Sequence, residues 1–142
     1  MDETLIIGII ILFTLFNKKS STEKFTNKYT IKAKISKTPN EIRQGLMFIK
    51  NKLPENHGML FKMKRKSIHS FWMKNTYIPL DMIFINKDGK VIGFKKNRKP
   101  LSLKSSSIRK PSDYVLEMNG GWVDKVGLKE DDTILINEIN NY

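Results

Sequence analysis

Short runs in which apolar and polar residues alternate constrain the fold of this chain more than any other feature. Residues 29–36, Tyr-Thr-Ile-Lys-Ala-Lys-Ile-Ser, place an apolar side chain at every second position. This period of two predicts a β-strand with one face in the core, because successive side chains of a strand point to opposite faces. Further candidate strands cover residues 58–63, 69–74, 80–86, 90–96, 114–119 and 133–139.

A short helix is expected directly after the first strand. Thr38 is a favoured N-cap residue, Pro39 suits the first helical position, and Glu41 completes a capping box. We therefore expect a helix that runs to about Gln44 and ends at Gly45, since glycine is the preferred residue just past a helix.

Turn residues connect the later strands. Asn86-Lys-Asp-Gly89 is a hairpin signal between two of the candidate strands, and Gly120-Gly121 breaks the chain before a helical turn at residues 122–126. Short strands, close turns and little helix predict a mainly β domain, namely an antiparallel β-sandwich or barrel with one or two short helices.

The length allows one domain and a tail, because domains cluster near 100–150 residues and this chain has 142. The hydrophobic fraction of 39%, with two Trp and eight Phe, is enough for a core. The chain contains no cysteine, which excludes disulfides, thiolate metal sites and thiol nucleophiles.

An uncharged N-terminal segment stands apart from the strand pattern. Residues 4–17 are apolar on all sides and would rise roughly 21 Å as a helix, against roughly 30 Å for the hydrocarbon core of a bilayer. Lys18 and Lys19 follow it and can snorkel to the headgroups. We expect an N-terminal apolar helix that contacts the membrane through residues 5–16.

Two alternatives to this membrane anchor remain open. A cleaved signal peptide is disfavoured, because Asp2 and Glu3 precede the apolar run and no small-residue cleavage site follows it. A buried helix of the domain is the other alternative. The anchor interpretation divides the chain into an anchor at residues 1–19, a polar linker at 20–28 and a single β domain at 29–142. Lysines just after the anchor place the domain on the cytosolic side by the positive-inside rule.

The formal net charge of +12 invites a nucleic-acid interpretation. Only four of the 26 basic residues are arginine, however, and the abundant Lys, Ile and Asn all have AT-rich codons. Drift in genome composition therefore accounts for the lysines, and we expect no specific nucleic-acid partner. Residues 97–112, rich in Lys, Ser and Pro, form a long loop that is either mobile and solvated or ligand-binding.

Five ordered sequence blocks resemble the domain-of-unknown-function family 192, an uncharacterised ancient conserved region. The blocks are Gly45-Leu-Met47, Gly58-Met-Leu-Phe61, Phe71-Trp-Met-Lys-Asn-Thr76, Pro79-Leu-Asp81 and Tyr114-Val-Leu-Glu117. The resemblance implies a compact β-sandwich of jelly-roll type and brings no established reaction. Many family members follow an export signal, whereas the N-terminal segment here reads as uncleaved.

The residues of these blocks that could carry chemistry are Trp72, Lys74, Asn75, Asp81 and Glu117. We expect them to be ligand-binding candidates rather than catalytic residues. Asp81 also has a structural interpretation, as an acceptor for backbone N–H groups of the turn that follows Lys74. Asp81 and Glu117 would make the paired carboxylates of a glycosidase if they lay close together.

We expect no metal or other cofactor. The methionines in the apolar blocks raise the possibility of cuprous copper, which favours thioether ligands, but methionine is also an ordinary core residue. His57 and His69 lie twelve residues apart without a third ligand-like partner, so zinc is disfavoured.

Two functional hypotheses follow. The first is a membrane-anchored, non-enzymatic β-sandwich that acts in binding or assembly with an unidentified protein partner. Its setting would be the internal membrane or capsid of a virion, as a minor structural component of a large DNA virus particle. The second is a small hydrolase, or a domain binding a carbohydrate or other small ligand, with a pocket near Trp72, Asp81 and Glu117. A closed surface near Trp72 favours the first hypothesis and a concave polar pocket favours the second.

Overall fold

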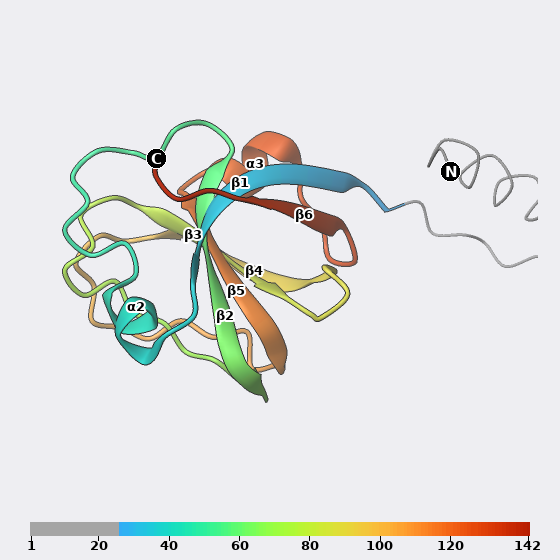
Figure 1. Ribbon diagram of the computed structural model, residues 1–142, viewed down its shortest axis with the longest axis horizontal. Helices are drawn as coiled ribbons and strands as arrows, with labels where there is room; N and C mark the ends of the chain where they lie inside the picture. Colours follow the sequence, from blue (N-terminus) through green and yellow to red (C-terminus); the bar gives the residue numbers. More distant parts are fainter. Residues whose placement is uncertain (1–25) are drawn as a thin grey trace, which may run out of the picture.

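The computed structural model describes residues 26–142, and the predicted N-terminal helix and most of the predicted linker lie outside this range. The described residues form one six-stranded sheet with the order β4-β3-β5-β2-β1-β6 and two short helices (Figure 1). The strands are β1 (Lys28–Ser36), β2 (His57–Ser67), β3 (Leu80–Ile85), β4 (Val91–Arg98), β5 (Ser112–Asn119) and β6 (Thr133–Glu138). The mainly β prediction is confirmed.

The sheet curls into a half-barrel, and its two edge strands, β4 and β6, contact each other at one end. The N–H of Val91 on β4 donates to the carbonyl of Asp132 at 2.8 Å, and the N–H of Ile134 on β6 donates to that of Gly89 at 2.9 Å. The predicted sandwich of two sheets is therefore replaced by one sheet bent towards itself. This curvature follows from the twist that all strands share.

The pairing is mixed, whereas an antiparallel sheet was predicted. β2, β5, β3 and β4 pair antiparallel in that order, but β1 pairs parallel with both β2 and β6. A parallel pair needs a long crossover between its strands. Residues 37–56 supply that crossover, with helix α2 (Pro39–Gln44) inside it.

Both faces of the sheet are buried. One face packs a core that includes Ile31, Ile83, Leu116 and the side chain of Trp122 from helix α3 (Trp122–Val126). The other face packs a core that includes Met59, Phe61, Met73, Met82 and Phe84. All six residues of β3 are buried, as the continuous apolar run of this strand predicts.

The expected helix at residues 39–44 is confirmed together with its cap. The Thr38 hydroxyl accepts the N–H of Glu41 at 3.2 Å, and the Glu41 carboxylate accepts the N–H of Thr38 at 3.0 Å. Gly45 ends the helix with φ of 48°. The predicted hairpin turn at residues 86–89 and the helical turn at 122–126 are confirmed as well.

The predicted strand at residues 69–74 is wrong. This segment makes one isolated bridge, between Phe71 and Ser106, and otherwise runs irregularly across the sheet. Phe71 and Met73 pack on the core while Trp72 and Lys74 point outward, so the alternation is real. The alternation reflects a segment with one buried face. This segment cannot add to the sheet beside β2, the strand that precedes it, because both sides of β2 are already paired with β1 and β5.

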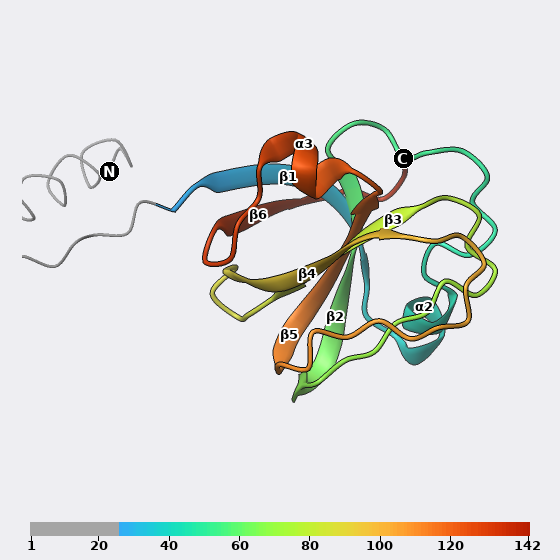
Figure 2. The ribbon, with the colours of Figure 1, turned by 180° about the vertical axis from the view of Figure 1, so that it is seen from behind.

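Three loops gather at the end of the molecule opposite the start of β1, as the two views show (Figures 1 and 2). They comprise residues 45–54, 68–79 and 99–111. The long loop after β4 is tied to the loop before β3, since Met73 donates its N–H to Ser102 at 2.9 Å and Leu101 donates to Thr76 at 3.0 Å. Within residues 26–142, no helix has the length and hydrophobicity that crossing a bilayer requires.

Candidate functional site

Glu117 is a carboxyl group in an apolar setting. It lies on β5 opposite Met59 of β2 and Met82 of β3, and its residue surface is only 4% exposed. Burial raises the pKa of Glu117 to about 8, because an apolar environment disfavours the charged form. At neutral pH the group is therefore mainly protonated, and it can both donate and accept a hydrogen bond.

Glu117 faces a pocket of about 230 Å³, which we call the Glu117 pocket. The pocket lies between the end of α2, the β2 side chains Phe61 and Met63, and the segment that carries Trp72. Its other polar lining groups are Arg43, Gln44, His69, Ser70, Lys74 and Thr76. Glu117 is the only carboxylate that lines it among the described residues.

Gly45 keeps the approach to this carboxyl open. A Cβ at position 45 would lie 3.1 Å from Cζ of Phe61 and 3.9 Å from Oε2 of Glu117. The positive φ of 48° also favours glycine there. Gly45 thus ends helix α2 and also leaves space beside the Glu117 carboxyl group. A side chain at position 45 would narrow that space.

Trp72 and Lys74 form the outer part of the pocket. Trp72 is 46% exposed, and Nζ of Lys74 lies 5.1 Å from the centroid of its indole ring. This is the geometry of a cation–π contact, which is worth about 0.5–1 kcal/mol at an exposed site. The indole therefore offers a flat apolar surface beside a cation and a neutral acid.

Asn75 has a backbone role in the structure. It adopts a left-handed conformation with φ of 53°, and its carbonyl accepts the N–H of Phe48 at 2.8 Å. Asparagine tolerates this conformation better than most residues. Its side chain does not line the Glu117 pocket, so it connects two loops rather than joining Trp72 and Lys74.

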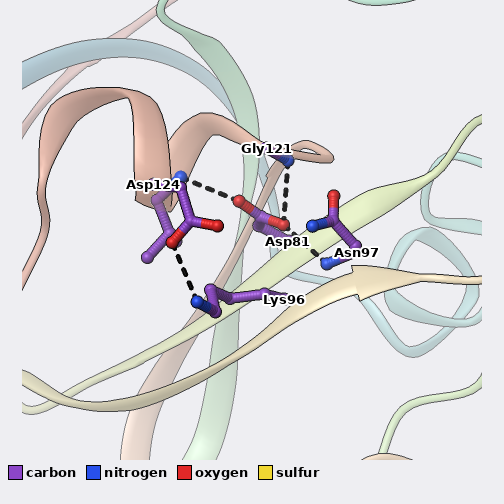
Figure 3. Close-up of polar contacts among 6 residues, drawn as sticks. Asp81, Lys96, Asn97, Gly121 and Asp124 are labelled. Atoms are coloured by element: carbon purple, nitrogen blue, oxygen red, sulfur yellow. Dashed lines mark hydrogen bonds and ion pairs between the residues drawn. The ribbon is translucent and has the colours of Figure 1, made fainter.

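Asp81 is fully buried and bonds to the backbone of two other elements (Figure 3). Its Oδ1 accepts the N–H of Asn97 at 2.8 Å and of Gly121 at 3.2 Å, and its Oδ2 accepts the N–H of Val123 at 2.8 Å. The carboxylate thus joins the end of β4 to the start of α3. Asp81 was expected to accept N–H groups of the turn that follows Lys74. None of its three donors belongs to that turn.

Asp81 and Glu117 point to opposite faces of the sheet. Asp81 pairs with Met118, one residue along from Glu117, and successive side chains of a strand alternate between faces. Asp81 shares its face with Ile83 and α3, whereas Glu117 shares its face with Met59 and Met82. The two carboxyl groups therefore cannot flank one glycosidic bond.

The structure adds site residues that sequence reasoning missed. Arg43, Gln44 and Gly45 reach the pocket because α2 ends beside it; the available hints were the capping signal for that helix and, for Gly45, the first family block. His69 lines the pocket, and its Nε2 donates to the carbonyl of Ser112 at 3.0 Å. Among residues 26–142, no three His, Asp or Glu side chains converge on a metal position.

Two solved structures share this fold. A proposed transcription regulator from Sinorhizobium meliloti 1021 is 38% identical, with the match covering 71% of this chain and 78% of that one at a TM-score of 0.68. A protein of unknown function from Novosphingobium aromaticivorans DSM 12444 is 35% identical, with 71% of both chains covered and a TM-score of 0.68. No curated protein matches at a significant level.

Residues 21–136 match the family model DUF192, described as an uncharacterised ACR, and the chain belongs to this family. The match confirms the resemblance carried by the five sequence blocks. The family description names no reaction, and a fold alone does not define a function, so the function is inferred from the site itself.

Proposed function

We propose that this protein is a small-ligand-binding domain whose ligand enters the Glu117 pocket and stacks on Trp72. The observation that carries the proposal is a buried carboxyl group, Glu117, that lines a pocket, and its burial raises its pKa. Burying an acid without a bond partner costs free energy, and a ligand that enters the pocket can supply the hydrogen bond that offsets this cost.

The size and chemistry of the pocket favour a small, hydroxyl-bearing ligand such as a monosaccharide unit. A volume of about 230 Å³ lies below the range of roughly 300–1,000 Å³ typical of drug-sized ligands, so the ligand or the part of it that enters must be small. An exposed indole binds a flat apolar face, while Glu117, Ser70 and Thr76 supply donors and acceptors. Binding is favoured over hydrolysis because the described residues place no second carboxylate in the pocket.

The two tryptophans provide an internal control for the test. Trp72 lines the pocket, whereas Trp122 is 6% exposed on the other face and its indole N–H donates to Asn56. In a titration of the full-length protein with cellobiose and N,N′-diacetylchitobiose, the indole NMR signal of Trp72 should shift in a saturable way. The Trp122 signal should not move.

Variants then test the named contacts. Trp72→Ala and Glu117→Leu should each weaken binding by about tenfold or more, since each removes one directional contact. Tyr77→Ala is the matched control, because Tyr77 is similarly exposed at 44% but does not line the pocket. The proposal fails if no sugar shifts the Trp72 signal, or if all three variants lose affinity equally.

A second proposal retains the membrane-anchored binding or assembly protein, in a virion or elsewhere. The favouring observation is a group of exposed apolar side chains on the loops around residues 48, 77, 101 and 103, where Phe48 and Tyr77 have ring centroids 6.4 Å apart. Exposed apolar patches mark interaction surfaces. Deleting residues 1–19 should move the protein from the membrane fraction to the soluble fraction. Retention of the truncated protein on membranes would contradict the anchor.

A further inference from the structure

A second pocket lies beside the Glu117 pocket and has a different chemical character. It has a volume of about 600 Å³ and lies between the end of β4, residues 104–109 and the segment at residues 68–70. Its charged lining groups are all cationic, namely Lys95, Arg98, Lys104 and Arg109. Ser105, Ser106 and Ser107 add hydroxyl groups. We call it the basic pocket.

Two buried polar groups in this pocket have no bond partner. Ser106 is 4% exposed and its Oγ makes no hydrogen bond, and Nε of Arg98 is also buried without an acceptor. Nearly all buried donors in folded proteins are satisfied, so two orphans lining one pocket need an explanation. Both atoms lie beneath the pocket surface, so a bound group with acceptor oxygens would satisfy them once the Ser106 and Arg98 side chains turn towards it.

The four cations make no ion pair with another residue in the described range 26–142. Ion pairs between described residues engage other lysines, Lys96 with Asp124 and Lys110 with Glu130 among them, and no acidic side chain lines the basic pocket. Like charges gathered without a counter-ion repel one another. An anion in the pocket would relieve that repulsion.

The loop backbone holds the serines in place. Ser106 exchanges two hydrogen bonds with Phe71, at 3.0 and 2.7 Å, and Arg109 adopts a left-handed conformation with φ of 57°. The N–H of Arg109 donates to the hydroxyl of Ser107 at 3.1 Å. A non-glycine residue held at positive φ is a local strain, and such strain is concentrated at ligand sites.

We propose that the basic pocket binds a phosphate monoester group. Arginine donates in a planar fork that matches phosphate oxygens, and lysine and serine supply single donors, so the donor set fits a dianion with several acceptors. The pocket is far larger than one phosphate ion, which leaves room for the group that the phosphate esterifies. This site is separate from the Glu117 pocket, although Ser70 lines both.

The phosphate can come from a soluble metabolite or from a lipid headgroup, and the experiment separates these sources. The full-length protein is titrated with glycerol 3-phosphate and with inorganic phosphate, while the Nε–H signal of Arg98 is followed by NMR. In parallel, the protein is mixed with phosphatidylcholine vesicles containing phosphatidic acid, or phosphatidylserine at equal charge, and sedimented.

Matched variants identify the site. Arg109→Gln and Ser106→Ala should each weaken binding about tenfold. Arg65→Gln removes the same charge from an exposed position outside the pocket and should change binding less than twofold. Because Ser106→Ala also removes an unsatisfied buried hydroxyl, its thermal midpoint without ligand should be equal or higher.

Saturable binding of glycerol 3-phosphate with this variant pattern supports the proposal and a soluble source. The same pattern seen only with phosphatidic acid vesicles supports the proposal and a lipid source. Binding to phosphatidylserine as strong as to phosphatidic acid, an equal loss in Arg65→Gln, or no saturable binding to any probe would overturn it. Each result is independent of the sugar titration, because Trp72 does not line the basic pocket.

Discussion

Two buried acids on neighbouring strands show how strongly the environment of a residue decides its role. Asp81 and Glu117 are both under 5% exposed, and both were ligand-binding candidates from the sequence, although Asp81 also had a structural interpretation. Asp81 accepts three backbone N–H bonds and joins three elements. Glu117 faces a pocket, and burial raises its pKa. We therefore interpret Asp81 as structural and Glu117 as the ligand-binding acid.

Glu117→Gln should change the pH dependence of stability. The pKa of Glu117 is about 8 in the folded state against 4.5 for the unperturbed group, so the unfolded state releases its proton first as the pH rises. As the pH rises from about 4.5 to about 8, this group lowers the free energy of unfolding progressively, by an amount on the order of a few kcal/mol in total, and the loss remains above pH 8. Denaturant unfolding should give the variant and the wild type similar stability near pH 4.5, and the variant higher stability at pH 8.5. A constant difference across this range would contradict the raised pKa.

Asp81→Ala should destabilise the protein by about 3 kcal/mol or more, because three buried N–H groups lose their acceptor. Asp124→Ala is the control. Its ion pair with Lys96 is exposed to solvent, which screens the attraction, so its loss should change stability far less. Thermal melts of the two variants measure the difference. An unchanged or raised midpoint for Asp81→Ala would reassign Asp81 to a ligand site.

At the scale of the elements, most strands could be predicted because their period of two and their turn residues are local signals. The parallel pairing of β1 was missed, although its cause was visible as a helix and a loop between two strands. The side of the sheet on which Asp81 and Glu117 lie depends on the register of three strands, which no local signal specifies. Trp72 and Glu117, which line the Glu117 pocket, were among the residues proposed from the sequence. Arg43 and His69 were not, because tertiary packing brings them to the pocket.

Gly58→Ala tests the close packing of β2 against β5. A Cβ at position 58 would lie 2.4 Å from Sδ of Met118 and 2.6 Å from the carbonyl oxygen of Glu117. The backbone atom cannot yield without disturbing the strand pair, so we expect a loss of about 2–3 kcal/mol in unfolding free energy. Gly127→Ala has open space and only a positive φ of 68°, and it should cost about 1 kcal/mol. Equal losses in the two variants would contradict the packing argument.

At the scale of the whole molecule, the fold gathers charge that the sequence disperses. The three loops at residues 45–54, 68–79 and 99–111 contain seven Lys and Arg residues and no Asp or Glu: Lys50, Lys52, Lys74, Lys99, Lys104, Arg109 and Lys110. Both pockets and most of the exposed apolar side chains lie at this end. From the sequence, the lysines were attributed to drift in genome composition, because the loops that carry them are far apart along the chain and come together only in the fold.

This basic end should bind nucleic acid weakly and without sequence preference. Sequence readout in the major groove needs side chains on an element that enters the groove, with arginines free to make paired contacts to guanine. Both described helices are six residues or shorter, and Arg109 is the one arginine in the three loops of the basic end. Contacts to phosphates remain, and their affinity falls steeply with salt because bound counterions are released. Fluorescence anisotropy with two unrelated 20-base-pair duplexes should give equal affinities at low salt and none at physiological ionic strength. Selective binding of one duplex at physiological ionic strength would instead place this protein with sequence-reading regulators, and Arg109→Gln would then be expected to reduce that selectivity.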